Sequence, residues 1–435
     1  MNAEDVIRNK RDGRELSREE IDYFIQGLVT GRVADYQASA WAMAVYFRGM
    51  TRRETSDLAL AMAKSGEVMD LSAIDGIKVD KHSTGGVGDK TTPVVAALAA
   101  AAGVPVAKLS GRGLGFTGGT IDKFESIPGF RTELTRQEFI DQVNRIKLAV
   151  ISQTGNLVPA DKKLYALRDV TATVDSIPLI ASSVMSKKIA SGADAIVLDI
   201  KVGQGAFMKD LDQAIELAET MVEIGRQAGR RVSAILSDMN RPLGHAIGNA
   251  LEIKEAVDTL KGCGPGDLTE LCLVIAAHMV YLGGAAPDLK SAHDLVEGLL
   301  QKGRGYTKLC EMVEAQGGEA ESLDNLTEAS PARLQVEVRA DRAGYITCLK
   351  TDEIGRIVMR LGAGREMAGQ TIDHAVGLVL LRKTGDLVEK GDVMAVIHAN
   401  DPVKLDMARR NLPLTFSWGE EPPPSVPVVL LSIGP

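Results

Sequence analysis

The stretch from Val79 to Pro93, VDKHSTGGVGDKTTP, concentrates groups that bind anions: three glycines, two lysines and four hydroxyls. A nucleotide P-loop places its lysine directly after the last glycine, but here Asp89 separates Gly88 from Lys90. A carboxylate at that point repels a polyphosphate, and the dinucleotide pattern GxGxxG is absent from the loop. The stretch therefore predicts a cradle for one small anion, in which glycines let the backbone approach the ligand.

A second group of donors lies in AKLSGRGLGFTGGT, where Lys108 and Ser110 end a predicted strand and Thr120 follows a glycine-rich turn. No acidic partner follows at the end of the next strand, so this turn is not a dinucleotide site. Loops that follow parallel strands converge at one edge of a sheet, so both groups are expected at the same place. The residues expected around a single phosphate are Lys81, Ser83, Thr92, Lys108, Ser110 and Thr120.

A third group lies in SVMSKK, where Ser183 and Lys187 are four residues apart and share one helix face, with Arg168 in the preceding YALRDV. One interpretation is a solvated basic face. The other is a fork of donors that suits the carbonyl groups of a planar base, or the negative charge that develops on it.

The sequence pattern of the elements that must position these groups changes near Gly76. Before it, SREE and TRRE each fit a capping box at the start of a helix, and VADYQASAWAMAVYFRGM is apolar almost all round, which is typical of a buried helix or a subunit contact. After it, short β-rich runs alternate with helical stretches, which indicates an α/β sheet. LYALRDVTATVDSIPLIASSVMSKKIASG interrupts this alternation and is expected to join the N-terminal helices, leaving a cleft between two lobes.

The last quarter of the chain begins with a stretch rich in charged and small polar residues, from Gly317 to Gly344, which indicates a connector into a final unit. Within that unit, KTGDLVEKGDVMAVIHAN resembles the hairpins of biotinyl and lipoyl carrier domains. The modifiable lysine of those carriers is missing, so a carrier role is not expected.

Composition excludes several other functions. The 435 residues are 45% hydrophobic and 25% charged, which is enough for a large core divided into two or three domains. A net charge of -8 argues against a broad nucleic-acid footprint. The four cysteines have no metal-ligand spacing, no apolar run is long enough for a membrane span, and the start of the chain is too charged for a signal peptide. We expect a cytoplasmic protein without a cofactor, a bound metal or a membrane partner.

The motifs KHSTGGVGDKTT, SGRGLGFTGGTIDKFESIPGF, LYALRDVTATVDSIPLIASSVMSKK and DIKVGQGAFM resemble those of the thymidine and pyrimidine-nucleoside phosphorylases, over essentially the whole chain. The resemblance implies an α/β protein with a helical lobe (residues 1–66 and 162–192), a large mixed α/β lobe that binds phosphate (67–161 and 193–330) and a C-terminal α+β subdomain (331–435). It also implies a homodimer, formed through the helical lobe, and closure of the lobes about a hinge.

The activity that the resemblance implies is the reversible phosphorolysis of a pyrimidine nucleoside, with inorganic phosphate as co-substrate. Arg168, Ser183 and Lys187 would bind the pyrimidine, and the six residues named above would bind phosphate. His82 would lie between them and donate to O2 of the base, while Arg168 and Lys187 stabilise the leaving base. The catalytic residues implied are thus His82, Arg168 and Lys187. The sequence leaves open which base and which sugar the site prefers.

Two positions depart from what the family usually shows. Phe116 stands where many members carry histidine, so we expect lobe closure to rest more on apolar contact. Lys90 stands where the bacterial branch often has threonine, and there the positions matching Gly88, Lys90, Leu243, Ala246 and Glu255 hold potassium. We expect the Lys90 ammonium to take the place of that ion and to pair with Glu255, with no monovalent metal bound.

Two other functions compete with this interpretation. An enzyme similar to anthranilate phosphoribosyltransferase shares the two-lobed plan, but it needs an acidic pair for magnesium, and only Asp89 is found in a matching loop. A catalytically silent homologue that serves as a binding protein is the second alternative. The intact set of His82, Arg168, Ser183 and Lys187 argues against it.

Overall fold

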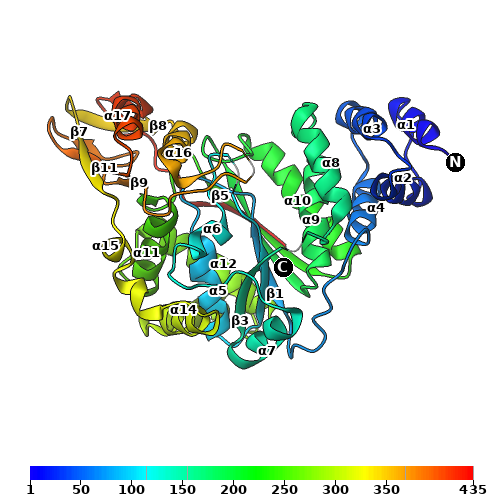
Figure 1. Ribbon diagram of the computed structural model, residues 1–435, viewed down its shortest axis with the longest axis horizontal. Helices are drawn as coiled ribbons and strands as arrows, with labels where there is room; N and C mark the ends of the chain where they lie inside the picture. The colour runs from blue at the N-terminus through cyan, green and yellow to red at the C-terminus, as the bar shows by residue number, and fades with distance from the viewer. Residues whose placement is uncertain (114, 154, 368, 435) are drawn as a thin grey trace.

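The computed structural model describes residues 1–113, 115–153, 155–367 and 369–434. Leu114, which falls within the motif SGRGLGFTGGTIDKFESIPGF, and Thr154 lie outside this description. Figure 1 shows the three parts of the molecule: the α/β lobe at the centre, the N-terminal helices on one side and the C-terminal subdomain on the other. The predicted fold class is confirmed.

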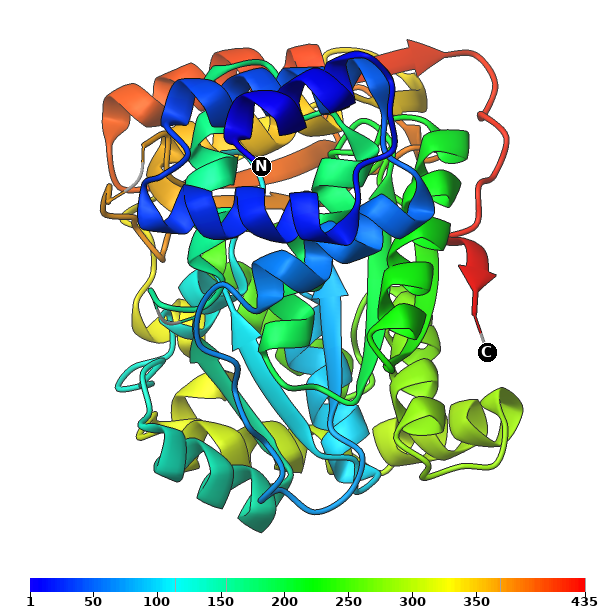
Figure 2. The same cartoon turned by 90° about the vertical axis from the view of Figure 1, so that its right-hand side faces the viewer.

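The helical lobe combines two segments that are far apart in the sequence. Its N-terminal helices are α1 (Ala3–Arg11), α2 (Arg18–Thr30), α3 (Asp35–Arg48) and α4 (Arg52–Ala63), and α8 (Pro159–Val170) and α9 (Ile177–Ala190) pack against them. Both predicted capping boxes are present: Ser17 with Glu20 begins α2, and Thr51 with Glu54 begins α4. Figure 2 shows these helices lying across the upper end of the sheet.

The main sheet has the order β1-β4-β5-β13, and a smaller parallel pair joins β2 to β3. The first three strands of the sheet are parallel: β1 (Val79–Ser83), β4 (Ala195–Val202) and β5 (Arg231–Asp238). In the smaller pair, β2 (Val106–Ser110) and β3 (Leu148–Ser152) align Ser110 with Ser152 at their carboxyl ends. Two of the residues predicted for phosphate, Ser83 and Ser110, thus stand at the carboxyl ends of parallel strands.

Helices cover both faces of the sheet. The ones that connect or flank the strands are α5 (Thr91–Ala101), α6 (Thr120–Phe124), α7 (Arg136–Ile146), α10 (Leu211–Gln227), α11 (Asn249–Leu260), α12 (Gly266–Leu282), α13 (Leu289–Gln301) and α14 (Arg304–Ala315). Buried side chains form one core that runs from the helical lobe onto the sheet, through Met62, Met185 and Leu198. A second core, which includes Leu98, Val197 and Ile275, lies between the sheet and α5, α11 and α12. The helical lobe therefore does not have a core separate from the sheet.

The C-terminal subdomain has a core of its own, built on two small sheets. Its elements are β7 (Leu334–Arg339), β8 (Gly344–Leu349), α16 (Thr351–Val358), β9 (Gly377–Leu380), β10 (Leu387–Val388), β11 (Val393–Ala399), α17 (Pro402–Asn411) and β12 (Phe416–Gly419). It shares a sheet with the α/β lobe, because β6 (Ala246–Ile247) pairs with β9. This shared sheet fixes the subdomain against the α/β lobe.

Two segments differ from the prediction. The predicted connector includes a 3-10 turn at Ala320–Asp324, α15 (Leu326–Ala329) and strand β7, whose charged residues alternate with apolar ones and so resemble a polar linker. The last strand, β13 (Val429–Ile433), leaves the C-terminal subdomain and pairs with the edge of the main sheet at β5. Residues 429–433 thus extend the α/β sheet, although the prediction places them in the C-terminal unit.

Candidate active site

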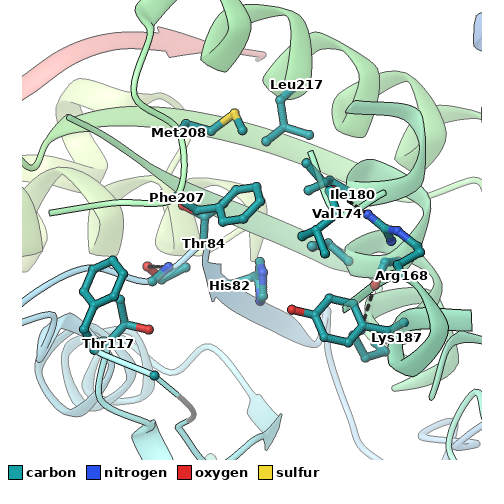
Figure 3. A pocket seen from close by; sticks show the side chains of 17 residues that line it. His82, Thr84, Thr117, Arg168, Val174, Ile180, Lys187, Phe207, Met208 and Leu217 are labelled. Carbon is teal, nitrogen blue, oxygen red and sulfur yellow. Dashed lines mark hydrogen bonds between the residues drawn. The ribbon is translucent and has the colours of Figure 1, made fainter. Parts of the chain in front are cut away.

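Two adjoining cavities lie between the strand ends and the helical lobe. The first, of about 390 Å³, is lined from the sheet side by His82, Ser83 and Thr117, and from the helical lobe by the three predicted base-binding residues. The second, of about 650 Å³, is lined by Ser110 and Ser152 of the sheet and by residues of α8. Tyr165 and Lys187 line both cavities. In Figure 3, His82 lies between Thr117 on one side and Arg168 and Lys187 on the other.

The two lysines predicted for phosphate are buried in the strands beneath these cavities. Lys81 donates to Thr91 Oγ1 over 2.6 Å and lies 3.1 Å from Asp199. Lys108 lies 3.4 Å from Asp80, which also accepts from Lys188 of α9 over 2.7 Å. Burial lowers the pKa of Lys108 to about 8, although the charge of Asp80 opposes the change. The structure thus places these ammonium groups in a buried network, in which the carboxylates hold them in position.

The four hydroxyls predicted for phosphate lie at the ends of strands and at the starts of helices. Ser83 accepts from the backbone N–H of Gly85 over 3.1 Å, and Ser110 ends β2 at the wall of the second cavity. Thr92 is buried in the first turn of α5, and Thr120 is the first residue of α6. Because a helix N-terminus carries unpaired N–H groups and a partial positive charge, the start of α5 adds to the attraction for an anion.

His82 follows Lys81 on β1 and lines the first cavity. Its Nε2 is buried and has no hydrogen-bond partner among the described residues. Burial, and then the charges of Lys188, Lys108 and the neighbouring lysines, hold the pKa of His82 well below its ordinary value. The lowered pKa favours the neutral imidazole in the ligand-free protein, in which one ring nitrogen carries a hydrogen that can be donated.

The predicted base-binding residues lie together on α8 and α9. Arg168 donates to three backbone carbonyls, those of Thr173, Val174 and Leu179, at 2.7 to 3.1 Å, which leaves two of its five N–H groups for a ligand. Lys187 donates to Ser183 Oγ over 3.1 Å. The three side chains line the same cavity, and the backbone carbonyls hold Arg168 in place.

Sequence reasoning missed the partner of Lys187, which is Asp161 at 2.6 Å on the first turn of α8. It also missed the apolar residues between the donors, namely Val174, Ile180, Phe207, Met208 and Leu217, which Figure 3 shows around the cavity. The motif DIKVGQGAFM contains two of them, Phe207 and Met208. Their apolar side chains beside a glycine-rich turn could have indicated that they line the cavity. Together these side chains form an apolar slot, of the kind that accepts a planar ring.

Lys90 immediately precedes α5, near the end of the stretch from Val79 to Pro93, and is fully buried. Its ammonium donates to Glu255 Oε2 over 2.6 Å and to the carbonyls of Leu243 and Ala246 over 2.6 and 2.8 Å. The predicted pairing with Glu255 is confirmed. Since one ammonium already takes these three oxygens, the residues do not fit a potassium ion as well.

Phe116 lines the first cavity beside Thr117. The Arg356 guanidinium lies 5.3 Å from the centre of its ring and the Lys209 ammonium lies 6.0 Å from it. Both distances fall within the range of cation–π contacts. The residue that replaces histidine therefore carries an aromatic face that neighbouring cations contact.

The structure thus combines a helical bundle with an α/β sheet and places two cavities between them. In agreement, the chain matches the family models described as "Glycosyl transferase family, helical bundle domain" over residues 4–66 and "Glycosyl transferase family, a/b domain" over 75–306. A third model, "Pyrimidine nucleoside phosphorylase C-terminal domain", matches residues 345–415.

Comparison with individual curated proteins narrows the glycosyl transferases to one family. The chain is 57% identical to pyrimidine-nucleoside phosphorylase from Geobacillus stearothermophilus and 56% identical to that from Bacillus subtilis, in each case over 92% of both chains. It belongs to the pyrimidine-nucleoside phosphorylase family. The structure of anthranilate phosphoribosyltransferase from Thermus thermophilus shares the fold, with a TM-score of 0.59 and 21% identity over 72% of this chain and 99% of that one.

Proposed function

We propose that this protein catalyses the reversible phosphorolysis of pyrimidine nucleosides to the free base and (deoxy)ribose 1-phosphate. The observation that carries the proposal is the arrangement of two sets of donors, an anion cradle on the sheet and a base fork on α8 and α9, with His82 between them. The similarity to curated pyrimidine-nucleoside phosphorylases supports it. The test is release of base from uridine, thymidine and deoxyuridine with and without phosphate.

In the proposed mechanism, the six residues Lys81, Ser83, Thr92, Lys108, Ser110 and Thr120 bind phosphate and offset its charge. A phosphate oxygen bonds to C1′ as the bond from C1′ to the base breaks, and the electron pair leaves with the base. The sugar passes through a state with oxocarbenium character, so a correctly placed nucleophile and a stabilised leaving group are both required.

The leaving base would be stabilised by Arg168, Ser183 and Lys187. Lys187 is held by Asp161 at 2.6 Å, which keeps the ammonium directed along the helix face. His82, whose neutral imidazole has an N–H to donate, would hydrogen-bond to O2 of the base as negative charge develops there. A phosphate dianion nearby would raise the pKa of His82, so binding of the co-substrate would favour the protonated imidazole, which can transfer a proton to the leaving base.

We also propose that the lobes close on the two substrates, because the predicted phosphate groups belong to the α/β lobe, the predicted base groups belong to the helical lobe, and members of both sets line the cavities between the lobes. Closure would exclude water from C1′, where hydrolysis competes with phosphorolysis. The buried pair of Lys188 on α9 with Asp80 on β1 lies at the junction of the lobes and is suited to act as a fixed point of that motion.

A homodimer through the helical lobe is part of the proposal. Its first support is the outer face of α3, where Tyr36 and Phe47 are 77% and 76% exposed. Its second is a neighbouring groove of about 690 Å³, which is lined by Ile7 of α1 and by Met43 and Phe47 of α3. Exposed apolar patches of this kind mark protein contacts. We expect the wild-type protein to sediment at the mass of two chains and the Phe47→Glu variant to sediment closer to the mass of one chain. A wild type that sediments as one chain would contradict it.

Independence from potassium is the last part of the proposal. Because the Lys90 ammonium takes the oxygens of Leu243, Ala246 and Glu255, no monovalent cation is needed to hold these segments together. Turnover in potassium phosphate and in tetramethylammonium phosphate should therefore be equal.

A further inference from the structure

The segment of residues 111–119, called the glycine-rich loop below, joins Ser110 at the end of β2 to Thr120 at the start of α6. The two ends of this loop meet closely: a Cβ on Gly119 would lie 2.0 Å from the backbone nitrogen of Gly113. The same Gly113 nitrogen donates to Asp122 Oδ2 over 2.7 Å. The position of Asp122 and the shape of the loop are therefore coupled.

A residue of the C-terminal subdomain, Arg365, holds this loop from outside. Its guanidinium donates to Asp122 Oδ1 over 2.7 Å and lies 3.4 Å from the carbonyl of Gly113, and its own carbonyl accepts from Gly115 over 3.0 Å. The side chains of Arg365 and Asp122 are 11% and 3% exposed. A charge-assisted bond in such a buried place is among the stronger ones in a protein.

The other cation near Asp122 does not replace this contact. Arg112 lies 3.6 Å from the same oxygen, but its side chain is 46% exposed and is bonded to Glu125. Asp122 therefore depends on the C-terminal subdomain for its close partner.

The subdomain makes a second contact with the loop at Phe116. The Arg356 guanidinium lies 5.3 Å from the Phe116 ring, and a Cβ on Gly355 would lie 2.9 Å from the Phe116 carbonyl oxygen. The first contact is made at Gly113, Gly115 and Asp122, and the second is made at Phe116. Gly115 and Phe116 line the first cavity, so the subdomain holds the loop at the cavity wall.

We infer that Arg365 is a positioning residue for phosphate: through Asp122 and the glycine-rich loop, it holds Ser110 and Thr120 at the distance that one phosphate requires. The C-terminal subdomain, which lines neither main cavity among its described residues, then acts on the reaction through this contact. The inference rests on the proposed role of Ser110 and Thr120. Without Arg365 the loop samples more conformations, so phosphate affinity falls while the chemical groups on α8 and α9 stay in place.

The test compares Arg365→Ala and Arg365→Lys with wild type at saturating nucleoside. Arg365→Ala is expected to raise the KM for phosphate at least tenfold with kcat within about threefold of wild type. Arg365→Lys, which keeps a charge near Asp122, is expected to restore the KM to within about threefold. The matched control is Arg382→Ala, which removes a guanidinium of the same subdomain that pairs with Asp392, and it should leave both constants within twofold.

A second readout does not depend on turnover. Trypsin cleaves after Arg112, inside the glycine-rich loop, and mass spectrometry of the fragments reports how fast this bond is cut relative to others. Cleavage there is expected to be about tenfold faster in Arg365→Ala than in Arg382→Ala, and slower again when phosphate is added. This separates the inference from the proposed function, since a wild type without phosphate-dependent base release would refute the function while the loop can still be measured.

The inference is overturned if Arg365→Ala keeps a phosphate KM within twofold of wild type, or if it loses only kcat. Equal cleavage rates at Arg112 in Arg365→Ala and in the control would also overturn it. Where Arg365→Ala fails to fold, Arg365→Gln keeps most of the side-chain volume and removes the charge, and the same thresholds apply to it.

Discussion

The buried ion pair of Lys90 with Glu255 gives the sharpest prediction on the free energy of unfolding. Replacing Lys90 by threonine removes an ammonium that is fully buried and leaves Glu255 and the carbonyls of Leu243 and Ala246 without it. Removal of one partner of a buried ion pair costs about 3–5 kcal/mol. Glu255 also accepts from the backbone N–H groups of His245 and Ala246, which keeps part of its charge satisfied. We therefore expect a loss of about 3 kcal/mol in the free energy of unfolding.

Potassium should restore most of this loss in the variant and do nothing for wild type. In Lys90→Thr the three oxygens and the new hydroxyl surround a space from which the ammonium has been removed. A cation present at 100 times its Kd for that space would return about 2.7 kcal/mol. The assay is urea unfolding of both proteins in potassium chloride and in tetramethylammonium chloride at equal ionic strength.

The matched control for this experiment is Lys10→Thr. Lys10 donates to Glu54 over 2.7 Å in a buried pair, and it belongs to α1, which Figure 1 shows at the outer end of the helical lobe. This variant should also be destabilised, but potassium should not rescue it. Stabilisation of wild type by potassium, or the same response to potassium in the two variants, would refute the assignment of Lys90 as a built-in cation.

Four further outcomes follow from the site. His82→Ala should lower kcat about a hundredfold with the fold intact by circular dichroism, because one preorganised donor is worth roughly 3 kcal/mol; an unchanged rate would remove His82 from the mechanism. Lys187→Ala should lower kcat to a similar extent, and wild-type turnover would exclude it from stabilising the base. Asp161→Asn should lower kcat/KM for the nucleoside about tenfold with an unchanged KM for phosphate, and a change in the phosphate KM alone would count against its pairing with Lys187. Finally, Lys108 has a pKa of about 8, so its charge is lost as pH rises through that value; the KM for phosphate should rise above pH 8 in wild type and stay flat in Lys108→Met, and a flat wild-type profile would contradict the role of this charge.

Local patterns of the sequence were sufficient for the elements that carry the site. The capping boxes at Ser17 and Thr51 are set by residues three apart, so the start of α2 and of α4 could be predicted. Short apolar runs bounded by glycines located the strands that end at Ser83 and Ser110, and parallel strands bring such ends to one edge. The pairing of Lys90 with Glu255 was predicted from the family resemblance, because no local pattern joins positions so far apart.

What the sequence could not supply are contacts set by tertiary packing. Asp161 meets Lys187 only because α8 and α9 pack side by side, and Arg365 meets Asp122 only because the C-terminal subdomain shares a sheet with β6. Strand β13 was missed for a similar reason, since its apolar residues pack on β5, almost 200 residues earlier in the chain. Buried carboxylates such as Asp80 and Asp199 alternate with apolar residues within strands, and nothing in that pattern says which lysine each one holds.

The most direct test of the central claim is the release of free base from uridine, thymidine and deoxyuridine, measured by chromatography with and without inorganic phosphate. The account predicts base release from at least one of these nucleosides only when phosphate is present, with formation of an equal amount of (deoxy)ribose 1-phosphate. Release without phosphate, or no release from any of the three, would contradict it.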